Sequence, residues 1–160
     1  MLASLLRKRL AAAAGPLSRQ TLGVLCQFSI SQNAGSTAVE VCTTGYSFTT
    51  ATGRVAKYGI FWGKNDPRNV IREMPGKTHV AAMLMALIDA VRVARKDESL
   101  DKLVIYTDFN CPPGFQSKLQ SYAARDFHSL SGLKMKNADL LKDLYESTKD
   151  MNSPWNAHDF

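Results

Sequence analysis

A short apolar run that ends in an acidic residue is the feature that most constrains the fold of this chain. Leu103-Val104-Ile105-Tyr106 leads through Thr107 directly into Asp108. A continuous run of this length is typical of a strand buried on both faces of a parallel sheet. The sequence therefore predicts an α/β fold in which this strand carries an aspartate to one end of the sheet.

Three segments that precede this run also have strand character. We expect strands over 38–46, 55–62 and 69–74, with a Thr-rich turn over 47–53 and a second turn over 63–67. Consecutive strands with short connections form an antiparallel meander.

A long helix is predicted between the meander and the strand at 103–107. Pro75-Gly76 interrupts the chain, Thr78 is well placed as an N-cap, and the helix is expected over 79–96. Its apolar stripe recurs at helical spacing in Val80, Leu84, Leu87 and Val91. A helical crossover predicts that the strand at 103–107 pairs in parallel with the strand at 38–46.

The remainder of the chain predicts two more helices and a last strand. The helices are expected over 115–128 and 138–149, with a loop over 129–132 between them, and the strand over 153–158. The folded domain is therefore predicted over 37–160, as a five-stranded mixed sheet flanked by helices.

The N-terminus differs from this domain in charge. All 14 acidic residues lie from Glu40 onward, whereas four of the 20 basic residues precede it: Arg7, Lys8, Arg9 and Arg19. An acid-free segment with Arg, Ser and leucines is typical of a mitochondrial transit peptide. We expect residues 1–36 to be that peptide and a linker, and the mature protein to reside in the mitochondrial matrix. The alternative is a basic tail that contacts nucleic acid or anionic lipid.

Cysteine usage gives weaker information. Cys26, Cys42 and Cys111 are odd in number and have no metal-binding spacing. This pattern indicates a reducing compartment and no structural zinc. Cys42 is expected to be a small buried apolar residue in its strand. No apolar run approaches the ~20 residues of a membrane span.

Several patches of the sequence, taken in order, resemble one known family. They are Tyr58-Gly59-Ile60-Phe61-Trp62-Gly63, Met74-Pro75-Gly76-Lys77-Thr78, Leu103 to Asp108, and Asn137 to Trp155. Together they resemble the type 1 ribonuclease H family, over about Val39 to His158. The resemblance implies a ribonuclease H-like fold.

The resemblance also implies where catalytic acids should lie. Active members hold two divalent metals with four clustered carboxylates, since only acidic oxygens balance that charge. In this chain Thr44 and Met83 occupy two of the acid positions, and Asp108 is the one family carboxylate present. The chain ends at Phe160, before the family's last helix, with Asp159 as an irregular stand-in for the fourth acid.

Each of these residues also has a purely structural interpretation. Met83 fits the apolar stripe of its helix, and Asp108 is placed to cap the Pro-Pro turn that follows it. His79 lies near the same end of the sheet. A solvent-facing side chain at the start of a helix is a simpler interpretation of this histidine than a metal ligand.

Contacts with nucleic acid are predicted at two places. The resemblance puts Lys77 and Thr78 where family members grip a DNA phosphate, and a helix N-terminus with a cation and a hydroxyl suits a phosphate. The family's basic protrusion aligns with 125–136. Lys118, Arg125, Lys134 and Lys136 supply a modest basic surface in and near this stretch. A solvated charged face is the alternative for this second group.

These observations leave three functions open. The first is a mitochondrial ribonuclease H-fold protein without nuclease activity and without a cofactor. It would bind structured RNA or RNA–DNA hybrid, or serve in a ribonucleoprotein such as the mitochondrial ribosome. The second is a divergent hybrid-specific endoribonuclease that uses Mg²⁺. The third is a protein-interaction module. The net charge of +2 from Glu40 onward does not decide among them.

Overall fold

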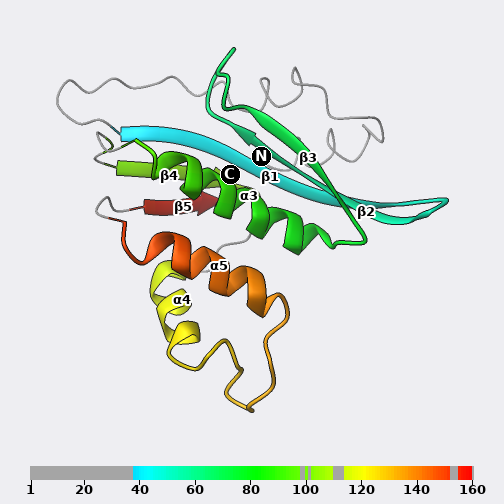
Figure 1. Cartoon of the computed structure of the whole chain (residues 1–160), viewed down its shortest axis with the longest axis vertical. Coiled ribbons are helices and arrows are strands. Elements are labelled where there is room, and N and C mark those ends of the chain that lie inside the picture. The colour runs from blue at the N-terminus through cyan, green and yellow to red at the C-terminus, as the bar shows by residue number, and fades with distance from the viewer. Residues whose placement is uncertain (1–37, 98–99, 101, 110–113, 152–154, 160) are drawn as a thin grey trace.

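The computed structural model describes residues 38–97, 100, 102–109 and 114–151, and the backbone of 155–159. The leader expected over 1–36 lies outside these residues. Within them, the elements follow in this order (Figure 1): β1 (Ala38–Thr50), β2 (Gly53–Phe61), β3 (Val70–Pro75), α3 (His79–Ala94), β4 (Lys102–Thr107), α4 (Phe115–Ala123), α5 (Ala138–Thr148) and β5 (Trp155–Asp159).

The strands form one five-stranded mixed sheet in the order β3-β2-β1-β4-β5. β1 pairs antiparallel with β2, and β2 with β3, as expected for the meander. β4 pairs in parallel with β1 and with β5. The predicted fold class and the parallel pairing of the first and fourth strands are therefore confirmed.

The first hairpin is longer than predicted. The expected Thr-rich turn over 47–53 is wrong, because β1 continues through Thr50 and pairs with Gly53. Only two residues, Ala51 and Thr52, remain for the connection. Thr and Phe favour strands, and a two-residue connection suits a hairpin, so these residues extend the sheet rather than leave it.

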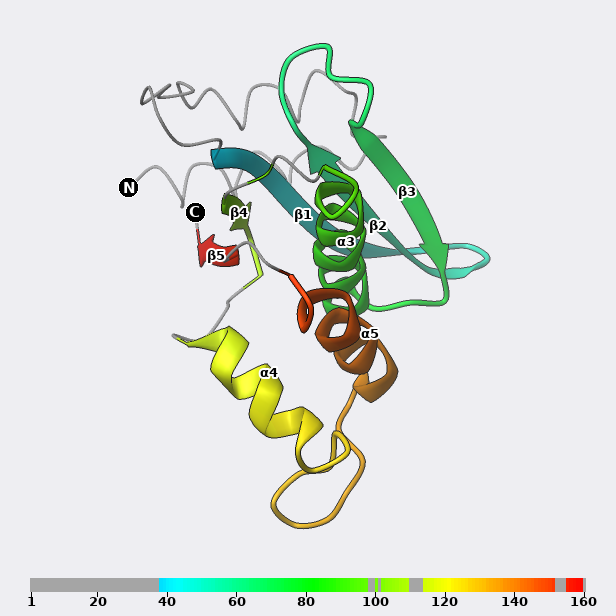
Figure 2. The same ribbon diagram turned by 60° about the vertical axis from the view of Figure 1, so that its left-hand side comes forward.

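α3 packs across one face of the sheet and forms the centre of the core (Figure 2). It begins as predicted, with Thr78 Oγ1 accepting a hydrogen bond from the Ala81 N–H at 3.3 Å, and ends two residues early at Ala94. The Tyr58 hydroxyl of β2 donates to Asp89 of α3 at 2.6 Å and ties the helix to the sheet. None of the helices in the described residues has the length and apolar character needed to span a bilayer.

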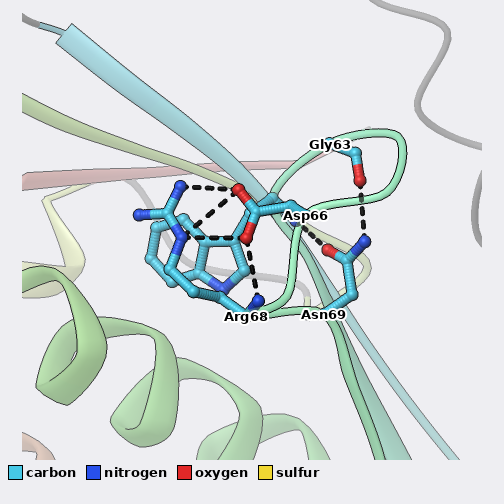
Figure 3. Close-up of polar contacts among 5 residues, drawn as sticks. Gly63, Asp66, Arg68 and Asn69 are labelled. Carbon is cyan, nitrogen blue, oxygen red and sulfur yellow. Dashed lines mark hydrogen bonds and ion pairs between the residues drawn. The ribbon is translucent and has the colours of Figure 1, made fainter.

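The connection between β2 and β3 is held by its own side chains (Figure 3). Asn69 Oδ1 accepts from the Trp62 N–H at 2.7 Å, and Asn69 Nδ2 donates to the Gly63 carbonyl at 2.7 Å. Arg68 pairs with Asp66, and its guanidinium lies 4.5 Å from the centroid of the Trp62 ring. The end of β2 is therefore fixed from both sides.

The predicted helix over 115–128 is shorter in the structure. α4 ends at Ala123, and Asp126 and Phe127 have left-handed φ values of 47° and 56°. The chain turns there because Phe127 is buried, with its ring centroid 6.4 Å from that of Tyr145 on α5. The last helix ends at Thr148, one residue early, and the last strand covers Trp155–Asp159 instead of 153–158.

Cys42 differs from its predicted state. It is buried, with 8% of its surface exposed, but it is disulfide-bonded and not a free apolar residue. Its partner lies outside the described residues, which contain no other cysteine. The inference of a reducing compartment from cysteine usage therefore has no support at Cys42.

Candidate functional site

The site is built where α3 crosses β1. A Cβ atom on Gly45 would lie 2.6 Å from the Met83 backbone nitrogen and 2.8 Å from Met83 Cγ. Glycine is therefore required for this close approach of helix and strand. Met83, which the sequence places at one acid position, therefore lies against Gly45, the residue that follows Thr44 at the other acid position.

Asp108 joins the same place from β4. Parallel pairing sets Thr43 opposite Thr107, so the next residues, Thr44 and Asp108, are neighbours at the end of the pair. Thr44 Oγ1 donates to Asp108 Oδ2 at 2.6 Å, and the Gly45 N–H donates to Oδ1 at 3.3 Å. These contacts tie Asp108 to β1, whereas the Pro-Pro turn that it was predicted to cap lies outside the described residues.

Burial dominates the electrostatics of this carboxylate. Desolvation raises the pKa of Asp108 above its ordinary value of 3.8. The hydrogen bonds from Thr44 and Gly45 and the electrostatic interaction with His79 lower the pKa of Asp108, without cancelling that rise. His79 itself is exposed at the start of α3, as predicted.

The residues present do not fit a two-metal centre. They offer one carboxylate, one hydroxyl that already donates to it, and a thioether, whereas Mg²⁺ requires oxygen ligands that carry negative charge. The described side chains contain no group of three or more His, Cys, Asp or Glu residues that could hold a metal ion. Asp159 on β5 is in register with Thr107 on β4, so the backbone of Asp159 lies at the same end of the sheet as Asp108.

Lys77 and Thr78 lie at the N-terminus of α3, as the sequence predicts. Lys77 is exposed, and Thr78 is half-buried with its hydroxyl oxygen accepting the capping hydrogen bond. The Lys77 ammonium group is therefore accessible to an anion, while the Thr78 hydroxyl oxygen is already used in capping α3.

The second predicted basic group lies on α4 and on the loop after it, away from the start of α3 (Figure 1). Lys118 is exposed on α4. Arg125 lies over the Tyr122 ring at 5.9 Å, and Lys134 pairs with Asp139 at 3.0 Å. The charge of Lys134 is thus partly offset, and the two predicted groups form separate surfaces.

Two features of the site were not predicted. The tight crossing at Gly45 has a signal in the sequence, since a glycine inside a strand often marks the close approach of another backbone. The exposure of Leu130 and Leu133, at 90% and 70%, has no signal in the sequence. The pattern of apolar residues in a loop does not distinguish exposed side chains from buried ones.

The chain is similar in sequence to known ribonucleases H, although no family model matches it. Mouse ribonuclease H1 is 29% identical over 102 residues, which cover 62% of this chain and 35% of the relative. Human ribonuclease H1 is 28% identical over 145 residues, which cover 89% of this chain and 47% of the relative. The chain thus spans less than half the length of these relatives.

Solved structures share its fold at low sequence identity. A foamy viral protease–reverse transcriptase in complex with double-stranded DNA has a TM-score of 0.64 at 14% identity, covering 76% of this chain and 80% of that one. The PFV ribonuclease H domain has a TM-score of 0.61 at 16% identity, covering 79% and 80%. A type 1 enzyme with the type 2 active-site motif, LC9-RNase H1, has a TM-score of 0.56 at 16% identity, covering 78% and 64%.

The order of the elements, the meeting of β1, α3 and β4 at Gly45 and Asp108, and these similarities agree with one another. The chain therefore has a ribonuclease H-like fold and is similar in sequence to ribonuclease H1.

Proposed function

We propose that this protein binds RNA–DNA hybrid or structured RNA without cleaving it. The observation that carries the proposal is the composition of the site: Thr44 adjoins Asp108, and Met83 lies against Gly45, where the family resemblance puts acids. Nucleic-acid binding is supported by the sequence similarity to human ribonuclease H1 and by the exposed Lys77 at the start of α3. A neighbour of this fold, the foamy viral enzyme, has been solved in complex with RNA/DNA hybrid.

The chemical reason for inactivity is the loss of negative charge. Two-metal phosphodiester hydrolysis depends on bound ions to generate the nucleophile and to stabilise the leaving oxygen. A hydroxyl and a thioether carry no negative charge and cannot balance the positive charge of those ions. A cofactor is therefore not part of the proposal. Mg²⁺ belongs only to the alternative of a divergent endoribonuclease.

The cleavage test uses the full chain with a labelled RNA–DNA hybrid in Mg²⁺ and in Mn²⁺. Human ribonuclease H1 in the same buffers is the positive control, and Asp108→Asn is the matched variant. We expect no cleavage above background by the wild type. Cleavage that disappears in Asp108→Asn would establish the endoribonuclease and refute the proposal.

The binding test is a salt titration by fluorescence anisotropy with hybrid and double-stranded RNA. Each lysine–phosphate contact adds about one unit to the log–log salt slope, so Lys77→Ala should lower the slope by roughly one and weaken binding of all sequences alike. Lys102→Ala is the control, because Lys102 is exposed at the opposite end of β4 from Asp108. An unchanged slope would move the contact elsewhere, first to Lys118 and Arg125.

A specific observation favours a second function in protein interaction. Leu130 and Leu133 are exposed on the loop after α4. Ser129 orders this loop, since its N–H donates to the Leu133 carbonyl at 2.8 Å and its Oγ accepts from the Leu133 N–H at 3.1 Å. A subunit of a ribonucleoprotein such as the mitochondrial ribosome would use both an RNA surface and such a loop. Failure of the wild type to bind any nucleic acid at low salt would favour protein interaction alone.

The proposed location is the mitochondrial matrix, on the basis of the acid-free leader. Residues 1–36 fused to a fluorescent protein should direct it to mitochondria, and diffuse cytosolic fluorescence would contradict this. The disulfide at Cys42 is more typical of an oxidising compartment. The full chain should therefore also be tested for resistance to protease after the outer membrane is ruptured, which a matrix protein retains.

A further inference from the structure

The hairpin formed by β1 and β2 carries an exposed aromatic ring close to its tip. The hairpin projects beyond the start of α3 (Figure 1), and Val55 of β2 pairs with Pro75, the last residue of β3. Phe48 is opposite Val55 and is 38% exposed. It is the one exposed aromatic residue among the described side chains. A single exposed apolar residue is not unusual in itself, so its surroundings decide what this ring can bind.

One face of the Phe48 ring is occupied, and the other is directed toward the hairpin tip. Tyr46 stacks on the ring with 5.8 Å between centroids, and Lys57 Nζ lies 5.6 Å from the Phe48 centroid. Tyr46 and Lys57 are cross-strand partners, so both reach the ring from the body of the sheet. Toward the tip, the next pair on the same face is Thr50 and Gly53. A Cβ atom on Gly53 would meet no atom within 4 Å, so the space there is open.

The surroundings of the ring are positively charged. Arg54 is exposed on the hairpin, and its carbonyl accepts a hydrogen bond from the Gly76 N–H at 2.7 Å. This bond holds the turn that carries Lys77 against the hairpin. Lys57 is paired with Glu73, whereas no acid of the described residues pairs with Arg54 or Lys77. Two cations whose charge is not offset therefore lie close to the open face of the ring.

An aromatic face beside cations is the combination that binds single-stranded nucleic acid. Any base can stack on such a ring, while basic side chains contact the phosphates. A protein partner would need about 800 Å² of surface on each side. The hairpin tip offers far less apolar surface, because Phe48 is surrounded by the exposed polar residues Thr49, Thr52 and Arg54. A base needs only the one ring.

We infer that Phe48 stacks on an unpaired base that flanks the duplex held at Lys77, with Arg54 beside it to attract the phosphates. The inference rests on the proposed function and narrows it. The preferred ligand is then a hybrid or structured RNA that carries a single-stranded extension, rather than a blunt duplex.

The test compares a blunt RNA–DNA hybrid with the same hybrid carrying a short unpaired extension at either end of its RNA strand. Binding to the full chain is measured by fluorescence anisotropy. We expect an extension at one of these ends to tighten binding about fivefold or more, which is the contribution of stacking one base on an aromatic side chain. Lys77→Ala should weaken binding of all the probes and keep their ratio.

Two variants at one position separate stacking from apolar contact and from folding. Phe48→Tyr keeps an aromatic face and should keep the preference for the extended probe. Phe48→Leu keeps an apolar side chain but has no aromatic face, and it should lose the preference. Both variants should bind the blunt hybrid as the wild type does, which also reports that they are folded.

The outcomes distinguish this inference from the proposed function. Equal affinity of the wild type for all probes would overturn the inference and leave the proposed function standing. A preference that survives in Phe48→Leu, or that is lost in Phe48→Tyr, would do the same. Failure of the wild type to bind any probe at low salt would instead refute the proposed nucleic-acid binding, and this inference with it.

Discussion

Restoring one acid to the candidate site should make the fold depend on pH and on divalent cations. Thr44 is 5% exposed, and its hydroxyl lies 2.6 Å from the Asp108 carboxylate. Thr44→Asp therefore places a second carboxylate against the first. Without a metal, the folded state must either hold two negative charges or bind an extra proton.

The magnitude follows from the distance. Two unit charges about 4 Å apart repel by about 4 kcal/mol at an effective dielectric constant of about 20. The lost hydroxyl donor adds about 1 kcal/mol. Because one pKa unit corresponds to about 1.4 kcal/mol, the pair relieves its repulsion by raising one carboxyl pKa by up to about 3 units. The unfolding free energy should thus fall by about 4–5 kcal/mol at neutral pH.

The pH dependence has a defined sign. A carboxyl whose pKa is raised by folding binds more protons in the folded state than in the unfolded state, so stability falls as pH rises through the interval between the two values. The penalty of Thr44→Asp should therefore shrink as the pH is lowered. Below pH ~4, where the unfolded carboxyls also protonate, only the about 1 kcal/mol of the lost hydroxyl donor should remain.

Urea unfolding followed by circular dichroism measures these effects, with Thr44→Asn as a control of the same size and no charge. Mg²⁺ at about ten times its dissociation constant should return about 1.4 kcal/mol to Thr44→Asp and nothing to Thr44→Asn. If the two variants are equally stable at neutral pH and neither responds to Mg²⁺, the two positions are not adjacent and the site is wrongly assembled.

Three further changes probe the same region and the fold that supports it. Asp108→Asn should stabilise the protein at neutral pH, since burial raises the pKa of Asp108, and the gain should vanish below pH ~3.8 in urea unfolding; a gain at all pH values would contradict this cause. Gly45→Ala should cost about 1–3 kcal/mol by thermal denaturation, and Met83→Ala should not rescue it, because the nearest atom is backbone. Asn69→Ala should cost about 2–3 kcal/mol, since it removes two hydrogen bonds and leaves the Trp62 N–H without its partner; a loss below about 0.5 kcal/mol would show that the β2–β3 connection holds itself by other contacts.

The fold was predictable because its periodic patterns were strong. The apolar run at 103–107 and the helical stripe from Val80 to Val91 correspond to β4 and α3 in the structure. The errors lie at boundaries, where tertiary contacts decide. β1 continues through Thr50 because hydrogen bonding to β2 stabilises the extended backbone. α4 ends at Ala123 because burial of Phe127 requires a turn.

The site was predictable only as a set of positions. Thr44, Met83 and Asp108 were located through the family resemblance, and the structure joins Thr44 to Asp108 and places Met83 against Gly45. Their contacts were not predictable, because the hydrogen bond between Thr44 and Asp108 depends on the parallel register of β1 and β4. A single sequence carries no direct signal for register between strands that are 50 or more residues apart, and the Cys42 disulfide was missed for the same reason.

Stability alone does not account for the aspartate at position 108. Burial raises the pKa of Asp108, so its charge costs free energy in the folded protein at neutral pH. Asparagine would form the same two contacts at lower cost, because its oxygen can accept from the Gly45 N–H and the Thr44 hydroxyl can accept as well as donate. A residue that lowers stability where a neutral substitute fits is typical of a functional position. We therefore expect Asp108→Asn to gain stability and to change the affinity for the proposed nucleic-acid partner. A variant that gained stability with unchanged affinity would separate Asp108 from binding and leave Lys77 as the contact to pursue.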